Sequence, residues 1–138
     1  MRALFTIATV MFCICATAQV FDNTYGGSGN DYSHAIDHTL DGGIVIAGLT
    51  NSSGAGGDDI FVTKTDGSGN IQWSFTYGSS AAEDFYTVIE ELSDSSLVVA
   101  GTSFGFGSGT YWDIIVFRLD QSGNIIWETQ IGNPHYDE

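Results

Sequence analysis

The sequence predicts an all-β protein built from two tandem repeats, each with four short antiparallel strands. Three observations support this prediction. Two long stretches of the chain match one another, short apolar runs alternate with turns rich in Gly, Asn and Asp, and no segment shows a sustained period of 3.6 residues. A chain of 138 residues is long enough for one domain. The repeats therefore account for most of that domain.

The repeat is clearest in a stretch of the chain that occurs twice. Residues 59–73 read DIFVTKTDGSGNIQW and residues 113–127 read DIIVFRLDQSGNIIW, with identical residues at most positions and an offset of 54. Two further matches lie upstream at offsets of 53 and 52: residues 41–48 with 94–101, and Tyr25-Gly26 with Tyr77-Gly78. The change in offset indicates single-residue insertions, which fall in stretches rich in Gly, Ser and Asn that are typical of loops.

Each repeat contains four predicted strands joined by tight turns. In the first repeat they are residues 34–40, 44–47, 60–65 and 71–75, and in the second they are 85–92, 97–103, 114–119 and 125–131. Residues 41–43 and 66–70 are turn sequences, because Gly and Asn accept the backbone conformations that such turns need. Ile44–Gly48 and Leu97–Gly101 are continuous apolar runs, typical of strands buried on both faces. We expect these runs to be the inner strands, where the repeats crowd together.

A tandem unit of four strands and about 50 residues is the signature of a β-propeller blade. We therefore expect blade 1 over about residues 25–76 and blade 2 over about 77–130, with the start of a third blade at 131–138. The chain is thus interpreted as an N-terminal fragment. Propellers close with about 4 to 8 blades, so further blades or self-association are needed to close a ring. The alternative fold is a two-sheet sandwich made from the same strands.

The repeats also resemble those of a known family. Residues 25–31 read Tyr-Gly-Gly-Ser-Gly-Asn-Asp, residues 41–48 read Asp-Gly-Gly-Ile-Val-Ile-Ala-Gly, and residues 66–73 read Asp-Gly-Ser-Gly-Asn-Ile-Gln-Trp. This pattern is similar to the SBBP-type β-propeller repeats of secreted bacterial proteins, and the similarity covers residues 25–132. The resemblance implies a cell-surface or extracellular protein, often exported by a type IX route in Bacteroidetes-like bacteria. It implies no particular activity.

Residues 1–18 have the features of a secretory signal peptide. Arg2 gives a short positive start, Leu4 to Cys15 is apolar, and Ala16-Thr17-Ala18 is a cleavage sequence that leaves Gln19 first. The apolar stretch is shorter than the ~20 residues of a membrane span, which disfavours an anchor. We therefore expect residues 19–138, the propeller repeat region, to be secreted or held at the cell surface without a membrane span. Both cysteines lie in the leader, which leaves the mature chain without disulfides.

The chain is strongly acidic, with 17 Asp and Glu against 3 Lys and Arg and a formal net charge of −14. Nucleic acids and anionic membrane surfaces are bound through clustered Lys and Arg, so the composition excludes both as partners. Hydrophobic residues make up 43% of the chain, which supplies enough apolar surface for a core and argues against disorder. The partners that remain are a protein or a carbohydrate ligand.

No residue pattern predicts an enzyme, a cofactor or a metal site. Residues 101–105 match the G-x-S-x-G of a nucleophile elbow, but no helix-forming sequence follows Ser103, as that motif requires. We interpret the match as the end of a strand. His34 and His38 would lie about 13 Å apart on a strand, too far to share a metal ion. We therefore predict a non-catalytic protein without a cofactor.

Acidic residues recur at two places in each repeat. Asp66 and Asp120 begin turns with oxygen groups at alternate positions, as a calcium loop does, but neither turn has the complete calcium-loop pattern. We interpret them as hairpin turns held by the Asp side chain. Asp59 and Asp113 precede the third strand, where we expect them to accept hydrogen bonds from backbone N–H groups of the loop. A calcium-stabilised structural repeat array remains an alternative.

Loops that vary between repeats on a rigid frame are the predicted binding surface. They are residues 51–58 and 104–112, and the candidate binding residues are the aromatics of the second loop: Phe104, Phe106, Tyr111 and Trp112. Trp73 and Trp127 recur in register and are predicted to pack between blades. The predicted function is binding, adhesion or scaffolding at the cell surface. The alternative is an accessory or partial propeller domain of a larger extracellular enzyme.

Overall fold

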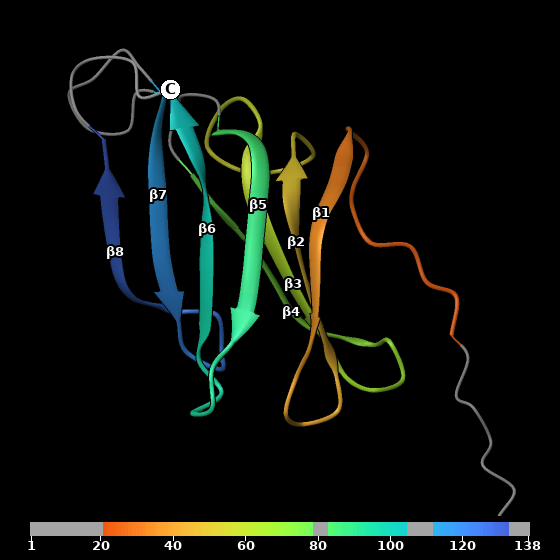
Figure 1. The fold of residues 1–138 in the computed structure, drawn as a ribbon. Helices are drawn as coiled ribbons and strands as arrows, with labels where there is room; N and C mark the ends of the chain where they lie inside the picture. The colour runs from red at the N-terminus through yellow and green to blue at the C-terminus, as the bar shows by residue number, and fades with distance from the viewer. Residues whose placement is uncertain (1–20, 79–82, 105–111, 133–138) are drawn as a thin grey trace, which may run out of the picture.

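The computed structural model describes residues 21–78, 83–104 and 112–132, which form two four-stranded antiparallel sheets and contain no helix (Figure 1). Sheet 1 consists of β1 (Asp31–His38), β2 (Ile44–Thr50), β3 (Asp59–Thr65) and β4 (Ile71–Tyr77). Sheet 2 consists of β5 (Glu83–Glu91), β6 (Leu97–Phe104), β7 (Trp112–Leu119) and β8 (Ile125–Ile131). In each sheet the strands lie in the order of the sequence, so one repeat forms one sheet. The predicted all-β class and antiparallel meanders are confirmed.

Strand bounds differ most from the prediction at β2, which continues to Thr50, and at β1. Strand β1 begins at Asp31, which pairs with Thr50, and a register shift between Ser33 and Ala35 accommodates the extra length. It ends at His38, because Thr39 already belongs to the hairpin turn. The N–H of Thr39 donates to the carbonyl of Gly43 at 3.0 Å.

The apolar runs predicted as inner strands are β2 and β6, the second strand of each sheet. The prediction that β2 is buried on both faces is correct for one face only. Val45 and Ala47 are fully buried, whereas Ile44 and Ile46, on the other face, are half-buried. The reason is that only one face of β2 is covered by sheet 2.

The two sheets pack face to face, with β5 lying against β1 and β2 (Figure 1). Because side chains alternate across a strand, each sheet has an inner face toward the other sheet and an outer face away from it. On the inner face of sheet 1 lie Val45, Ala47, Leu49, Ile60 and Val62. On the inner face of sheet 2 lie Leu97, Val99, Ile115, Phe117 and Leu119. These side chains form one hydrophobic core between the sheets.

The two repeats use opposite faces for their contact with each other. Val45 and Ala47, on the inner face of sheet 1, correspond in the repeat to Val98 and Ala100. Val98 and Ala100 lie on the outer face of sheet 2, because the inner face of that strand is formed by Leu97 and Val99. One face of the repeat therefore packs against the opposite face of the next repeat. A contact of this head-to-tail kind is able to recur from unit to unit.

An edge contact holds the outer rim of the stack together. Strand β4 of sheet 1 reaches the β7–β8 turn of sheet 2, where the Trp73 indole N–H donates to the Gln121 carbonyl at 2.9 Å. The Tyr77 hydroxyl donates to the Gly123 carbonyl at 2.6 Å. Gly123 has φ +83°, and a Cβ there would lie 2.7 Å from the Phe75 ring. The predicted packing role is confirmed for Trp73, whereas Trp127, at the equivalent position, is 41% exposed.

Among the described residues, an ion pair occurs at the same repeat position in each sheet. The Lys64 ammonium on β3 donates to Asp41 in the β1–β2 turn at 2.5 Å and to Gln72 at 2.6 Å. In sheet 2, the Arg118 guanidinium on β7 donates to Asp94 in the β5–β6 turn at 2.5 Å. These contacts tie each hairpin turn to the third strand of its sheet.

We predict that Trp73→Ala and Trp127→Ala have very different effects on stability. Trp73 packs against the core and bonds to the neighbouring sheet, so its truncation should lower the free energy of unfolding by about 2–4 kcal/mol. Trp127 lies on an exposed strand, so its truncation should change stability by less than about 0.5 kcal/mol. Urea unfolding of both variants measures the difference, and equal losses would contradict the assignment of the core.

A second prediction concerns acid stability. The hydrogen bonds from Lys64 and Thr39 lower the pKa of Asp41 to about 2. A carboxyl group whose pKa is lowered on folding stabilises the folded state at pH values above its ordinary pKa of 3.8. This stabilisation is lost as the pH falls through about 2. Asp41→Asn should therefore be less stable than the parent chain at pH 7, and the difference should vanish near pH 2. Urea titrations at several pH values check this, with Asp94→Asn as the matched variant in sheet 2.

Candidate functional site

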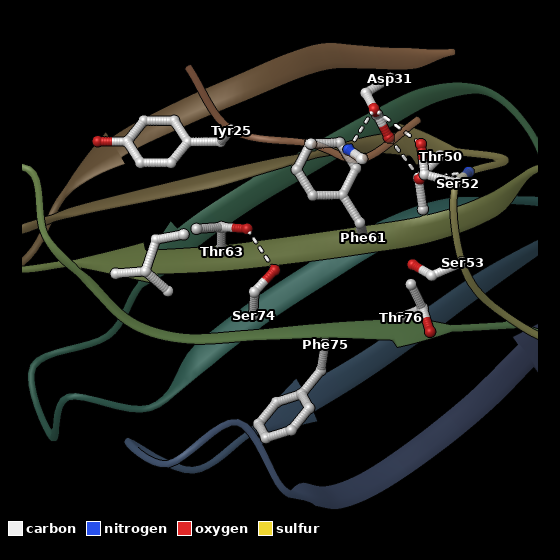
Figure 2. Close-up of a pocket in the computed structure, with 13 residues that line it drawn as sticks. Tyr25, Asp31, Thr50, Ser52, Ser53, Phe61, Thr63, Ser74, Phe75 and Thr76 are labelled. Carbon is white, nitrogen blue, oxygen red and sulfur yellow. Dashed lines mark hydrogen bonds between the residues drawn. The ribbon is translucent and has the colours of Figure 1, made fainter. Parts of the chain in front are cut away.

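A hollow with a volume of about 480 Å³ lies on the outer face of sheet 1 (Figure 2). Its lining combines hydroxyl groups with aromatic rings. The hydroxyl residues are Thr50, Ser52, Ser53, Thr63, Ser74 and Thr76, and the aromatic residues are Tyr25 and Phe61. Phe75 also lines the hollow, but its ring is directed toward Gly123 of sheet 2. One carboxylate, that of Asp31, completes the polar lining. We call this hollow the outer groove.

The sequence of β3 and β4 explains the polarity of the outer groove. Thr63 and Thr65 lie on the outer face of sheet 1, at the repeat positions that Phe117 and Leu119 occupy in sheet 2. The Thr63 hydroxyl forms a hydrogen bond of 2.7 Å with the hydroxyl of Ser74 (Figure 2). Sheet 1 thus carries hydroxyl groups where sheet 2 carries core residues. The outer face of sheet 1 is therefore more polar at these positions than its equivalent, the inner face of sheet 2.

Asp31 organises one end of the outer groove. Its carboxylate accepts hydrogen bonds from the Thr50 hydroxyl at 2.5 Å, the Gly27 N–H at 2.8 Å and the Ser52 hydroxyl at 2.9 Å (Figure 2). The bond from Thr50, followed by that from Gly27, lowers the pKa of Asp31 below its ordinary value. The carboxylate therefore stays ionised at neutral pH, and it fixes both the start of β1 and the loop after β2.

The segment before β1 covers the rim of the outer groove. The Asn23 amide and the Tyr25 hydroxyl both donate to the Gly69 carbonyl at 2.8 Å. A Cβ on Gly69, whose φ is +80°, would lie 2.5 Å from the Phe21 ring. Gly69 and Gly123 occupy the same place in the two repeats, so residues 21–25 contact sheet 1 as β4 contacts sheet 2.

The sequence analysis missed this role of Tyr25 and the role of Asp31. The signal was present, because Tyr25-Gly26 matches Tyr77-Gly78 at the end of β4. That match indicates that the residues before the first repeat have the pattern of a fourth strand. The outer groove depends on this segment, which forms one of its walls (Figure 2).

The predicted loop of residues 51–58 closes over the start of β3. The N–H of Ala55 donates to the Asp59 carboxylate at 3.1 Å, which confirms the predicted role of Asp59 toward the loop. Asp59 is only 1% exposed, and its burial raises the pKa of its carboxyl group. Its equivalent, Asp113, accepts a hydrogen bond from the Gln130 amide. Ser52 and Ser53 of this loop line the outer groove.

The four aromatic binding candidates are described only in part. Phe104 ends β6 and Trp112 begins β7, and these two residues pair with each other. Trp112 is 36% exposed. Phe106 and Tyr111 lie outside the described residues. The β2–β3 and β6–β7 connections meet the sheets at the same end, at the top of Figure 1, so both predicted loops begin on one side of the molecule.

The turns that raised the calcium alternative are internally hydrogen-bonded. One Asp66 oxygen accepts the N–H groups of Ser68 and Asn70, and the other accepts the Asn70 amide, all at 2.8–2.9 Å. Asp120 makes the same three contacts in sheet 2. These bonds, led by the one from the Asn side chain, lower the pKa of both carboxyl groups. The predicted Asp-held hairpin turns are confirmed.

The remaining sequence candidates are placed in strands. Ser103 lies within β6 and is fully buried, as a residue near the end of a strand. His34 lies in β1 with its ring centroid 6.4 Å from that of Tyr86. Among the described residues, no three His, Cys, Asp or Glu side chains are grouped closely enough to hold a metal ion.

The outer groove is suited to binding a neutral polar ligand. Its hydroxyl groups donate and accept hydrogen bonds, and its rings offer apolar faces. The residues lining the groove include neither Lys nor Arg, so nothing in its lining attracts an anion. Its lining thus combines groups that form hydrogen bonds with apolar rings.

The chain matches none of the known protein-family models and none of the curated proteins with which it was compared. No helix long and apolar enough to cross a membrane occurs in the part of the chain that the structure describes. The class defined by the structure is an all-β protein of two repeated antiparallel sheets.

The opposite pKa shifts of Asp59 and Asp31 give a test of the loop geometry. Burial raises the Asp59 pKa, so the parent chain gains stability as the pH falls through that raised value, and Asp59→Asn lacks this gain. The stability of the parent relative to Asp59→Asn should therefore rise between pH 7 and about pH 4.

Asp31→Asn is the matched control with the opposite sign. Hydrogen bonds lower the Asp31 pKa, so the advantage of the parent over this variant should shrink as the pH falls below the ordinary carboxyl value. Urea unfolding across the pH range measures both trends. Parallel trends in the two variants would contradict the burial of Asp59.

Proposed function

We propose that this chain is a non-catalytic extracellular scaffold of β-propeller type, which binds a carbohydrate at its exposed groove and loops. Propeller blades are four-stranded antiparallel meanders repeated in tandem, and each sheet here is one such meander. The SBBP-like pattern of residues 25–132 agrees with this proposal. Residues 1–18 would direct export and be removed, leaving the repeat region outside the cell.

The observation that carries the proposal is the apolar surface on the outer faces. A two-sheet sandwich buries its apolar side chains between the sheets and turns polar side chains outward. Here Ile36 on the outer face of sheet 1 is 65% exposed, and Val88 and Ile114 on sheet 2 are 60% and 48% exposed. Outer faces of this kind favour a unit made for further stacking, as in a propeller, over a closed sandwich.

Carbohydrate is the ligand class that the surface chemistry favours. Sugar hydroxyls pair with Ser and Thr hydroxyls, and aromatic rings pack on the apolar faces of sugars. The outer groove supplies both kinds of group, and Trp112 adds an exposed ring at the end of the sheets where the variable loops begin. The net charge of −14 also disfavours anionic ligands.

Binding to insoluble polysaccharides tests this proposal. The mature chain, with its first residue determined by mass spectrometry, would be sedimented with cellulose, chitin and peptidoglycan. We expect the chain to bind at least one of them, and we expect Trp112→Ala to weaken that binding about tenfold, because aromatic contacts dominate recognition surfaces.

Trp127→Ala is the control for this experiment, because Trp127 is as exposed as Trp112 but lies on β8, away from the loops. It should leave binding unchanged. Absence of binding to every polysaccharide, or equal losses in the two variants, would overturn the carbohydrate proposal. Detection of an unprocessed N-terminus in the exported chain would overturn the assignment of residues 1–18.

A further inference from the structure

The outer face of sheet 2 repeats the inner face of sheet 1, but no sheet formed by the described residues packs on it. Ile60 is 1% exposed on the inner face of sheet 1, whereas its equivalent Ile114 is 48% exposed. Ile131, the equivalent of Tyr77, is 55% exposed, and every residue of β8 is exposed. The outer face of sheet 2 therefore has apolar side chains at the positions that, in sheet 1, pack against sheet 2.

The structure also shows where such a face binds. In the observed stack, β4 lies along the β7–β8 turn, and Trp73 donates to the turn carbonyl of Gln121. β8 is the equivalent of β4, and the β3–β4 turn is the equivalent of the β7–β8 turn, with Gly67 in the place of Gln121. A second copy packed in the same way would therefore place its β8 along the β3–β4 turn of sheet 1. The outer face of sheet 1 is thus the matching surface for the outer face of sheet 2.

That position is already occupied by residues of the same chain. Asn23 and Tyr25 donate to the carbonyl of Gly69 in the β3–β4 turn, as Tyr77 donates to the carbonyl of Gly123. Phe21 packs on Gly69 as Phe75 packs on Gly123. Residues 21–25 therefore reproduce the edge contact of β4, although no sheet accompanies them among the described residues.

We propose that residues 21–25 form an intramolecular cap on the edge of sheet 1 and that strand β8 of a second copy of this chain competes for the same edge. Both occupants would use the turn of residues 66–70, so only one is able to bind at a time. The cap keeps the outer face of sheet 1 from taking up a second copy. Releasing the cap exposes a head-to-tail interface identical in plan to the one inside the molecule.

The test weakens the cap in the full mature chain without removing it. The double variant Asn23→Ala/Tyr25→Phe deletes both donors to Gly69 and keeps an aromatic ring at residue 25. Sedimentation velocity over a range of concentrations should show self-association about tenfold stronger than in the parent chain. Circular dichroism on the same samples establishes that the sheets are intact.

Two further substitutions in this background identify the competing strand. Adding Trp127→Glu should return the double variant to the monomer, because a charge is placed on the docking face of β8. Adding Ile125→Glu is the control, since Ile125 lies on the same strand, is 46% exposed and pairs with Leu119 of the opposite face. It should leave association unchanged. Association that survives Trp127→Glu would overturn the proposal.

A mixing experiment distinguishes head-to-tail binding from a symmetric dimer. Trp127→Glu should block binding through the outer face of sheet 2. Ile71→Glu, at an exposed residue lining the outer groove, should block binding through the outer face of sheet 1. In the double-variant background each should be monomeric alone, and an equal mixture should form a dimer and nothing larger. A dimer of either variant alone, or no dimer in the mixture, would contradict the proposal.

A peptide of residues 21–27 gives an independent measurement should the double variant fold poorly. Added in excess to the parent chain, it should compete for the same turn and leave any self-association weaker or unchanged. Added to the double variant, it should restore the monomer. Stronger association in the presence of the peptide, or no effect on an associated double variant, would rule out the cap.

Discussion

The structure depends on the edge contact by which an aromatic strand holds a tight turn of the neighbouring sheet. Trp73 and Tyr77 bury apolar rings at the rim of the core and donate to two carbonyl groups of one turn. The close approach of β4 to that turn requires Gly123, because a Cβ there would lie 2.7 Å from the Phe75 ring and 3.1 Å from the Trp73 ring. The contact joins the rims of the two sheets beside the core, against which Trp73 and Tyr77 also pack.

The fold was largely predictable because its determinants are local. The repeated Asp-x-Ser-Gly-Asn turns and the apolar runs fix hairpins between strands that are neighbours in sequence, and the structure contains those hairpins. Strand pairing needed no information from distant residues. The start of β1 was misplaced because it depends on Asp31 pairing with Thr50, and hydrogen bonds from the loop after β2 hold that pair.

The outer groove was harder to predict because it forms from residues that are not neighbours in sequence. The Tyr25 hydroxyl donates to the Gly69 carbonyl, and the Asp31 carboxylate accepts hydrogen bonds from the hydroxyl groups of Thr50 and Ser52. In each case the two partners are far apart in the sequence. Hydroxyl side chains on β3 looked like ordinary strand residues. Their importance became visible only when the register placed them on a face that the second repeat fills with Phe and Leu.

The paired cations have a consequence for the behaviour of the chain in solution. Lys64 and Arg118 are the two cationic side chains of the described residues, and each is neutralised by a turn carboxylate of its own sheet. The remaining carboxylates give every copy a negative field, which repels other copies and keeps their apolar outer faces apart. Dissolved salt screens that field over about 10 Å at 0.1 M, so ionic strength becomes the variable that governs whether copies meet at all.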